Sequence, residues 1–351
     1  MHADPAPLKV LLIGGTGTIS TPICERLSED PDIDLYVMNR GHQPLPVNAT
    51  QIICDFHDIE AMERALSPFS FDVVCNFIVY HPQEARQQVA FFKGKIRQYI
   101  FISTVVVYDH ETAVMIDETQ KQGNVFSLYG QEKSACEQIF FEAWQKDGFP
   151  VTVVRPSQTY GKDRIPLSVK GNSCWSVIDR IQRNRPVIIH GDGKSTWHCT
   201  HTEDFAHNFL QLINNEKTIG NAFHNIHPMV VNWDMIYHHL YRLLHREPQI
   251  VHIASDTLAL STTYDIRSSI LGDKQYSNLF DTTSLQEVIS DFRYTIDIQE
   301  GLHRYLNYME AHPEKKRPDP VYDAWCDHVI DAYRSFEQNP QHTFYKSSRR
   351  R

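Results

Sequence analysis

The stretch Lys9-Val-Leu-Leu-Ile13, followed by Gly14-Gly-Thr-Gly17-Thr-Ile-Ser20, decides the fold of this 351-residue chain. An apolar run that ends in clustered glycines before a helical pattern predicts a buried strand, a turn and a helix start. Without side chains at Gly14 and Gly17, the backbone can approach a pyrophosphate, and the following helix N-terminus attracts its charge. A tight turn without a ligand is the alternative. For a dinucleotide ligand, we expect contacts from Gly14, Thr16, Gly17, Thr18 and Ile19.

Strand-like and helix-like segments alternate through the first half of the chain, which predicts a parallel sheet with helical crossovers. We therefore expect an α/β fold, a Rossmann-type doubly wound parallel sheet with a smaller C-terminal substrate-binding domain. The expected dinucleotide-binding domain covers residues 1–165, and a strand near 221–226 returns to its sheet. Residues 166–351 would form mainly the substrate-binding domain and a C-terminal helical extension.

The overall composition is that of an ordinary soluble globular protein, with 41% hydrophobic and 22% charged residues. The net charge of −9 and the pI near 6.1 leave no basic field that would attract nucleic acid. The basic tail Arg349-Arg-Arg351 is interpreted as solvated and not as a binding patch.

The cysteine, histidine and hydropathy patterns bear on the cellular compartment, on membrane contact and on metal binding. Seven cysteines without a Cys-x-x-Cys pair indicate reduced thiols and a reducing compartment. The first residues lack the pattern of a signal peptide, and no apolar run approaches the roughly 18 residues of a membrane span. We therefore expect a cytoplasmic protein without membrane contact. Among the 19 histidines, neither His198 with His201 nor His238 with His239 forms a convincing metal set, so no metal is expected.

The stretch Tyr129-Gly-Gln-Glu-Lys133 carries the chemistry that we expect. Residues four apart lie on one face of a helix, so this tyrosine and lysine can project into one cleft. An ammonium beside a phenol favours the phenolate and lowers its pKa from about 10, which gives a proton donor and acceptor near neutral pH. Upstream, Ser103-Thr104 follows another strand-like run, at residues 98–102, and offers a hydroxyl to a substrate oxygen.

The order of glycine turn, Ser103-Thr104 and Tyr129-x-x-x-Lys133 resembles the short-chain dehydrogenase/reductase superfamily. Chain length and later motifs are similar to its extended branch, the NAD-dependent epimerase/dehydratase type, from about residue 8 to about residue 310. The resemblance implies an NAD(P) cofactor that performs the hydride chemistry. It also implies that Tyr129 takes the proton of a substrate hydroxyl, that Lys133 holds the nicotinamide ribose, and that Thr104 hydrogen-bonds the same substrate oxygen.

The end of the second predicted strand bears on the choice between NAD and NADP. NAD sites usually place an acid there for the ribose 2′-hydroxyl, whereas residues 33–38 are followed by Asn39-Arg40. No carboxylate repels a 2′-phosphate and Arg40 can pair with one, so we favour NADP over NAD. The resemblance implies further cofactor contacts from Asp55, Phe56, Asn76, Phe77 and Pro156, with core packing as the alternative for Phe77.

The substrate is expected to be a sugar or a nucleotide sugar. Besides Thr104, the resemblance implies substrate contacts from Tyr80, His81, Gln158, Trp197, His198 and His201. Many nucleotide-sugar enzymes carry an arginine where Trp197 stands, and that arginine pairs with the substrate diphosphate. Because an indole cannot form this bidentate pair, a sugar without a diphosphate is an alternative substrate.

The segment Ser103-Thr-Val-Val-Val-Tyr108 indicates the class of reaction. The related 4,6-dehydratases resemble Ser-Thr-Asp-Glu-Val-Tyr here, and the two acids help to eliminate water. Val105 and Val106 stand at those places and cannot transfer protons. We therefore expect an epimerase. One alternative is an NAD(P)H-dependent reductase or dehydrogenase with net cofactor turnover. A second is a non-catalytic dinucleotide-binding sensor or scaffold.

The chain continues beyond the usual end of the resembled family. Residues 313–320 break a helical pattern, and residues 322–336 form an amphipathic addition within the extension 313–351. This addition could dock on the body of the protein or on a partner subunit, so a homodimer is compatible with the sequence.

Overall fold

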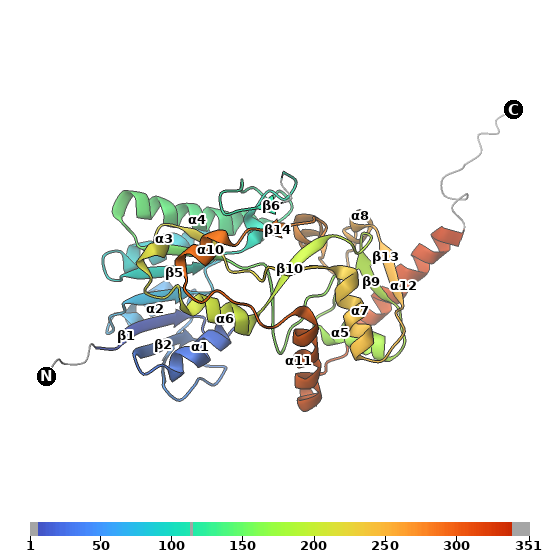
Figure 1. Ribbon diagram of the computed structural model, residues 1–351, viewed down its shortest axis with the longest axis horizontal. Helices are drawn as coiled ribbons and strands as arrows, with labels where there is room; N and C mark the ends of the chain where they lie inside the picture. Colours follow the sequence, from blue (N-terminus) through green and yellow to red (C-terminus); the bar gives the residue numbers. More distant parts are fainter. Residues whose placement is uncertain (1–5, 113–114, 339–351) are drawn as a thin grey trace.

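The computed structural model describes residues 6–112 and 115–338. A seven-stranded parallel sheet forms one end of the molecule, and a group of smaller sheets and helices forms the other (Figure 1). In spatial order the strands of the large sheet are β11 (Ala222–His224), β7 (Val151–Arg155), β5 (Gln98–Ile102), β4 (Val73–Asn76), β1 (Leu8–Ile13), β2 (Ile33–Asn39) and β3 (Ala49–Ile53). This is the expected doubly wound α/β architecture.

The strand order reverses at β1, which pairs with β2 on one side and with β4 on the other. In open parallel sheets, ligands bind beyond the carboxyl ends of the strands at such a reversal. The short strand β11 pairs in parallel with β7 at the far edge, which is the returning strand expected near residues 221–226. The glycine turn at the end of β1 therefore stands where a ligand crevice is expected.

Helices cover both faces of the sheet, and each face has its own apolar cluster (Figure 1). One face packs on α2 (Ile59–Leu66), α3 (Pro82–Phe92) and α4 (Leu128–Asp147). The other packs on α1 (Ser20–Glu29), α6 (Thr202–Leu210) and α10 (Thr283–Val288). Helix α4 begins at the cap Ser127, which accepts a hydrogen bond from the N–H of Gly130, and it ends at Gly148 in the left-handed conformation.

The second half of the chain has a separate apolar cluster around Trp197, Trp233 and Tyr237. Its sheets are small: β12–β10–β8, β13–β9 and β14–β6. The strands are β6 (Met115–Ile116), β8 (Gln158–Tyr160), β9 (Val187–His190), β10 (Thr196–His201), β12 (Val230–Asn232), β13 (Ile250–Ile253) and β14 (Leu279–Phe280). The helices are α5 (Trp175–Gln182), α7 (Trp233–Leu243), α8 (Ser255–Leu258), α9 (Arg267–Ser269), a π-helical turn (Ile270–Lys274), α11 (Ile298–Ala311) and α12 (Pro320–Gln338).

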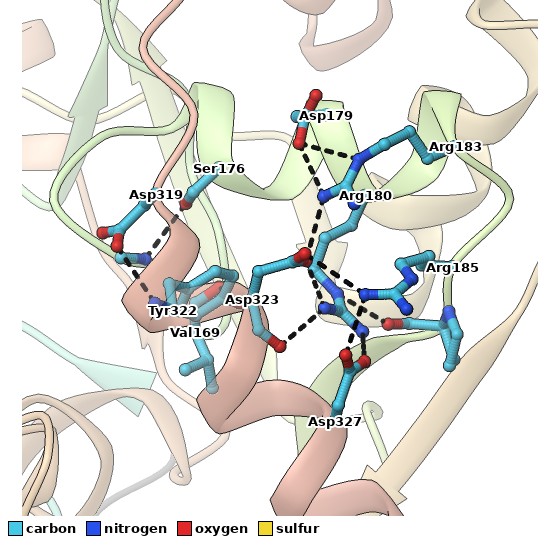
Figure 2. A network of polar contacts seen from close by, with 12 residues as sticks. Val169, Ser176, Asp179, Arg180, Arg183, Arg185, Asp319, Tyr322, Asp323 and Asp327 are labelled. Carbon is cyan, nitrogen blue, oxygen red and sulfur yellow. Dashed lines mark hydrogen bonds and ion pairs between the residues drawn. The ribbon is translucent and has the colours of Figure 1, made fainter.

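The C-terminal helix α12 docks on the body of its own chain. Its buried residues include Tyr322, Trp325 and Ile330, which join the apolar cluster of the second half. Figure 2 shows the polar side of this contact, where Arg180 of α5 lies between two carboxylates of α12. The Arg180 side chain is fully buried, and its Nη2 lies 2.8 Å from Oδ1 of Asp327. The basic tail at residues 349–351 lies outside the described residues.

Neither a membrane span nor a metal cluster is found in the part of the chain that the structure describes. No helix within residues 6–112 or 115–338 is long and apolar enough to cross a bilayer. Across the same ranges, no group of three or more His, Cys, Asp or Glu side chains is arranged to hold a metal ion. All seven cysteines are buried and free.

Candidate functional site

The glycine turn is built around a close contact between backbone and side chain. Gly14 has a φ of +82°, and a Cβ there would lie 2.7 Å from Cγ2 of Ile78, so only glycine fits without strain. The hydroxyl of Ser20 donates to the carbonyl of Gly14 at 2.7 Å and accepts from the N–H of Gly17 at 2.8 Å. Ser20, the first residue of α1, thus ties the two ends of the glycine turn together. Pro22 is tolerated because it lies in the first turn of that helix.

A cavity of about 490 Å³ opens beside this turn. Seven of the residues expected to contact the cofactor line it: Gly14, Thr16, Gly17, Asn39, Arg40, Asp55 and Phe56. Asn39 accepts hydrogen bonds at Oδ1 from the N–H of Gly41 and the side chain of Gln51, at 2.8 and 2.9 Å. Its Nδ2 is buried without a partner in the described structure, so the end of β2 offers a donor and the exposed Arg40, but no acid.

A second cavity, of about 310 Å³, adjoins the first through Tyr80, which lines both. We call it the inner cavity. Eight further residues predicted for the site line it: Ile19, Phe77, Thr104, Tyr129, Lys133, Pro156, Gln158 and Trp197. The structure therefore brings the three predicted catalytic side chains to one cavity, beside the one that the glycine turn borders.

Lys133 is held at the base of the inner cavity by backbone carbonyls. Its ammonium donates to the carbonyl oxygens of Val79 and Ile102 at 2.7 and 2.6 Å, and the residue is almost fully buried. An ammonium has three donors, so one remains for a ligand. Burial lowers the pKa of Lys133 to about 8.

Tyr129 differs from the expectation in its acidity. The residue is 40% exposed, but burial around the hydroxyl raises its pKa to about 12, and the neighbouring Tyr80 adds to this. Hydrogen bonding with the Thr104 hydroxyl acts in the opposite direction and is outweighed. The expected lowering of the tyrosine pKa is therefore wrong. The physical reason is that Lys133 directs its ammonium at two carbonyls, while the phenol loses water.

Asn76 and Thr18 line neither cavity, so their contact with a cofactor stays a prediction. The Asn76 side chain is fully buried, donates to Tyr99 and Gln88, and accepts from the N–H of Ile78. These hydrogen bonds hold the backbone that follows β4 in place. Thr18 is half-buried in the glycine turn and lines neither cavity.

The three predicted substrate-binding histidines also have other roles. His81 caps α3 and pairs with Glu132 at 3.0 Å on the surface. His198 is buried, with Nδ1 2.8 Å from the carbonyl oxygen of His227. His201 caps α6 by accepting from the N–H of Glu203 at 3.2 Å. None of the three rings lines the inner cavity, so their contact with a substrate stays a prediction.

A third cavity, of about 490 Å³, continues from the inner one, and both share Val106, Tyr129, Gln158, Arg164 and Asp273. We call it the outer cavity. Lys170 and Lys274 also line it. No sequence motif points to Arg164, Lys170 or Asp273, although residues 269–274 could supply a loop around the substrate. Only the tertiary fold brings these residues beside Tyr129.

Comparison with known families identifies residues 10–226 with the NAD dependent epimerase/dehydratase family. Among solved structures, the chain is similar to UDP-glucuronic acid 4-epimerase from Bacillus cereus in complex with UDP-glucuronic acid and NAD. The TM-score is 0.70 at 17% identity, with 87% of this chain and 99% of the other covered. Pal from Bacillus thuringiensis gives a TM-score of 0.70 at 19% identity and the same coverage. These likenesses concern the fold.

Curated relatives match only in part. The human dTDP-D-glucose 4,6-dehydratase is 27% identical over 125 residues, which cover 36% of this chain and 34% of that protein. The chain thus matches about a third of the length of this relative. The chloroplast stem-loop binding protein of 41 kDa b of Arabidopsis thaliana is 25% identical over 239 residues, covering 61% and 57% of the two chains.

Proposed function

Because the chain belongs to the NAD dependent epimerase/dehydratase family, we propose that it is an epimerase of a sugar or nucleotide sugar that works by transient oxidation of one hydroxyl. One observation carries the proposal. Thr104, Tyr129 and Lys133 line a single cavity, and that cavity adjoins the one bordered by the glycine turn. A protein that only binds a dinucleotide has no need of all three side chains.

The residues present fit a nicotinamide dinucleotide. The turn from Gly14 to Gly17 and the N-terminus of α1 suit the pyrophosphate, and α1 has no acid in its first turn to repel it. Asn39, Arg40 and Phe56 would border the adenosine end, while Phe77 and Pro156 would border the nicotinamide. When bound, the nicotinamide supplies the hydride acceptor and donor of the reaction.

The chain's own side chains manage the proton. Tyr129 would take the proton of the substrate hydroxyl at its phenolic oxygen and return it after the ketone has turned over. Thr104 would hold the same substrate oxygen. The remaining donor of Lys133 would hold a ribose hydroxyl of the cofactor. The pKa of Tyr129 is about 12 in the structure described, and a cationic cofactor ring held by Phe77 and Pro156 would lower it.

Elimination of water is the reaction that the cavity supports least. Val105 is buried and Val106 lines the inner and outer cavities, and neither side chain can donate or accept a proton. The proposal therefore differs from the dehydratase named among the relatives. The alternative with net cofactor turnover, a reductase or dehydrogenase, uses the same three residues and is distinguished by its product.

The outer cavity supports a substrate with an anionic handle. Arg164 and Lys170 line it, and guanidinium and ammonium groups bind phosphate. Trp197 cannot take that role, so a nucleotide sugar would use cations other than the arginine usual in the family. A free sugar remains the alternative substrate.

We also favour NADP over NAD, on the donors Asn39 Nδ2 and Arg40 at the end of β2. Competitive titration of the purified chain with both dinucleotides tests this choice. Affinity for NAD about tenfold above that for NADP would overturn it.

The function itself is tested by incubating the chain with a panel of UDP-sugars, dTDP-sugars and free sugars. Inversion at one carbon without added cofactor supports the epimerase. Stoichiometric change in reduced nicotinamide would instead identify the reductase. Bound dinucleotide with no turnover across the whole panel would favour the sensor or scaffold.

A further inference from the structure

We infer that Ser103, Trp197 and Asp273 form a subsite for the hydroxyl groups of a neutral sugar ring, on the walls around Tyr129. The inference rests on the proposed function and adds the part of the substrate that this cavity recognises. All three residues line the inner cavity together with Tyr129, and each has a buried polar atom without a hydrogen-bond partner in the described structure. Buried polar groups are almost always paired, so three such atoms around one cavity indicate a polar ligand.

Ser103 follows the last residue of β5. Its N–H donates to the carbonyl of Val154 at 2.8 Å, so the backbone is tied to the neighbouring strand β7. The residue is 2% exposed, and its Oγ has no partner within the described residues. A serine hydroxyl can both donate and accept, which suits a sugar hydroxyl in either role.

Trp197 lies on β10, opposite Val231 of β12. Its ring packs on Phe280, with centroids 5.9 Å apart, and the residue is 2% exposed. The indole Nε1 has no acceptor among the described residues. Since an indole N–H can only donate, it requires an oxygen lone pair from a ligand.

Asp273 lies in the π-helical turn Ile270–Lys274, where the inner and outer cavities join. The turn is fixed by hydrogen bonds from Asn124 to the carbonyl of Gly272 and from Ser195 and Trp233 to the carbonyl of Lys274. The adjacent ammonium of Lys274 donates to Leu167 and Ser168 carbonyls instead of to this carboxyl. The carboxyl oxygen Oδ1 is thus buried and unpartnered on a rigid segment.

The chemistry of the three groups selects hydroxyls over phosphate. A carboxyl beside the reacting position repels an anion, whereas it accepts from, and when protonated donates to, a hydroxyl. Burial raises the pKa of Asp273 to about 7, which makes both forms accessible. Arg164 lines both cavities, whereas Lys170 lines the outer one alone. A neutral ring beside Asp273 and a charged handle that extends past Arg164 towards Lys170 fit this arrangement.

The test compares sugar binding by the dinucleotide-loaded chain and its variants. UDP-glucose, UDP-glucuronic acid, dTDP-glucose and free glucose serve as probes, with affinity measured by thermal shift and calorimetry. Asp273→Ala and Trp197→Phe are each expected to weaken binding of the best probe about tenfold or more, while dinucleotide affinity stays unchanged. Asp273→Asn, which keeps an acceptor and a donor, should restore most of the affinity.

The matched control is Asp331→Asn, because Asp331 is an exposed acid on α12 that lines none of the three cavities. It is expected to leave sugar affinity within about twofold of the wild type. Wild-type affinity in both Asp273→Ala and Trp197→Phe would overturn the inference, and so would a wild type that binds none of the probes. If the wild type binds a sugar but never converts it, the proposed function fails and the subsite stands.

Discussion

The ammonium of Lys133 donates a 2.6 Å hydrogen bond to the carbonyl oxygen of Ile102, the last residue of β5. The bond joins helix α4 to the end of β5, two positions before the predicted catalytic Thr104 in the sequence. It also argues against one of the two roles expected of the lysine, since an ammonium directed at carbonyls does little to lower the pKa of Tyr129. Lys133 instead holds α4 against the backbone at Val79 and Ile102, and it keeps one donor for a ligand.

Replacing this lysine should affect activity more than stability. In Lys133→Met, two carbonyls lose a donor, but the cost of burying an ammonium disappears, so the free energy of unfolding should change by less than about 2 kcal/mol. Turnover should fall at least about 10²-fold. Urea unfolding and sugar turnover measure the two effects, with the exposed Lys146→Met as the control on the same helix. Turnover near the wild-type rate would contradict the role of Lys133.

A second anchor of α4 is the buried ion pair between Arg155 and Glu137. Nη2 of Arg155 lies 2.5 Å from Oε2 of Glu137, and both side chains are at most 3% exposed. Removing one charge leaves the other buried and unpaired, so Glu137→Gln should lower the free energy of unfolding by about 3–5 kcal/mol. In the exposed pair of the same helix, Glu142→Gln should change it by no more than about 0.5 kcal/mol. Equal losses in urea unfolding would refute this account of the anchor.

The dock of α12 depends on Arg180. Its guanidinium also donates to the carbonyls of Pro186 and Asp323, at 3.0 and 2.9 Å. Arg180→Ala should leave Asp323 and Asp327 with only the partly exposed Arg183 and Arg185 as partners. The loss of buried, charge-assisted hydrogen bonds should lower the free energy of unfolding by about 2–3 kcal/mol and expose α12 to protease. Arg183→Ala, which removes a guanidinium that is 43% exposed, should cost about 1 kcal/mol or less. A protease-resistant α12 in Arg180→Ala would contradict this prediction.

Asp273 should make stability depend on pH. Because its folded pKa, about 7, exceeds the ordinary 3.8, the folded chain binds more protons between these values, and its stability contribution is lost as pH rises through 7. The charged or titratable groups that face it are Lys274, Arg164 and Tyr129. Asp273→Asn should therefore melt at a higher temperature than the wild type above pH 7, with the gap closing towards pH 4. A gap of constant size across this range would contradict it.

Much of the fold could be predicted from the sequence because its signals are local. The strands predicted at 9–13, 33–38 and 98–102 are found with bounds that differ by at most one residue, since their apolar runs are local signals. By contrast, residues 196–201 carry no local signal for the strand β10. It pairs with β8 and β12, partners distant in the sequence, and its polar residues carry no strand alternation.

The difference between local signals and contacts of distant segments also applies to the site residues. The spacing of Tyr129 and Lys133 predicts a shared helix face, and both do line one cavity. His198 resembles a ligand residue in the sequence, but the fold satisfies its ring with the carbonyl of His227. Asp273 has no local signal, because its position depends on a π-helical turn held by Asn124 and Trp233.

The central claim is that Tyr129 transfers the proton while a sugar hydroxyl is oxidised in the inner cavity. The most direct test is a single-turnover measurement of reduced nicotinamide, with wild type and Tyr129→Phe mixed with the sugar that the wild type converts. We predict a rate at least about 10²-fold lower in the variant, with sugar and dinucleotide affinities unchanged. Reduction by Tyr129→Phe at near the wild-type rate would contradict the claim.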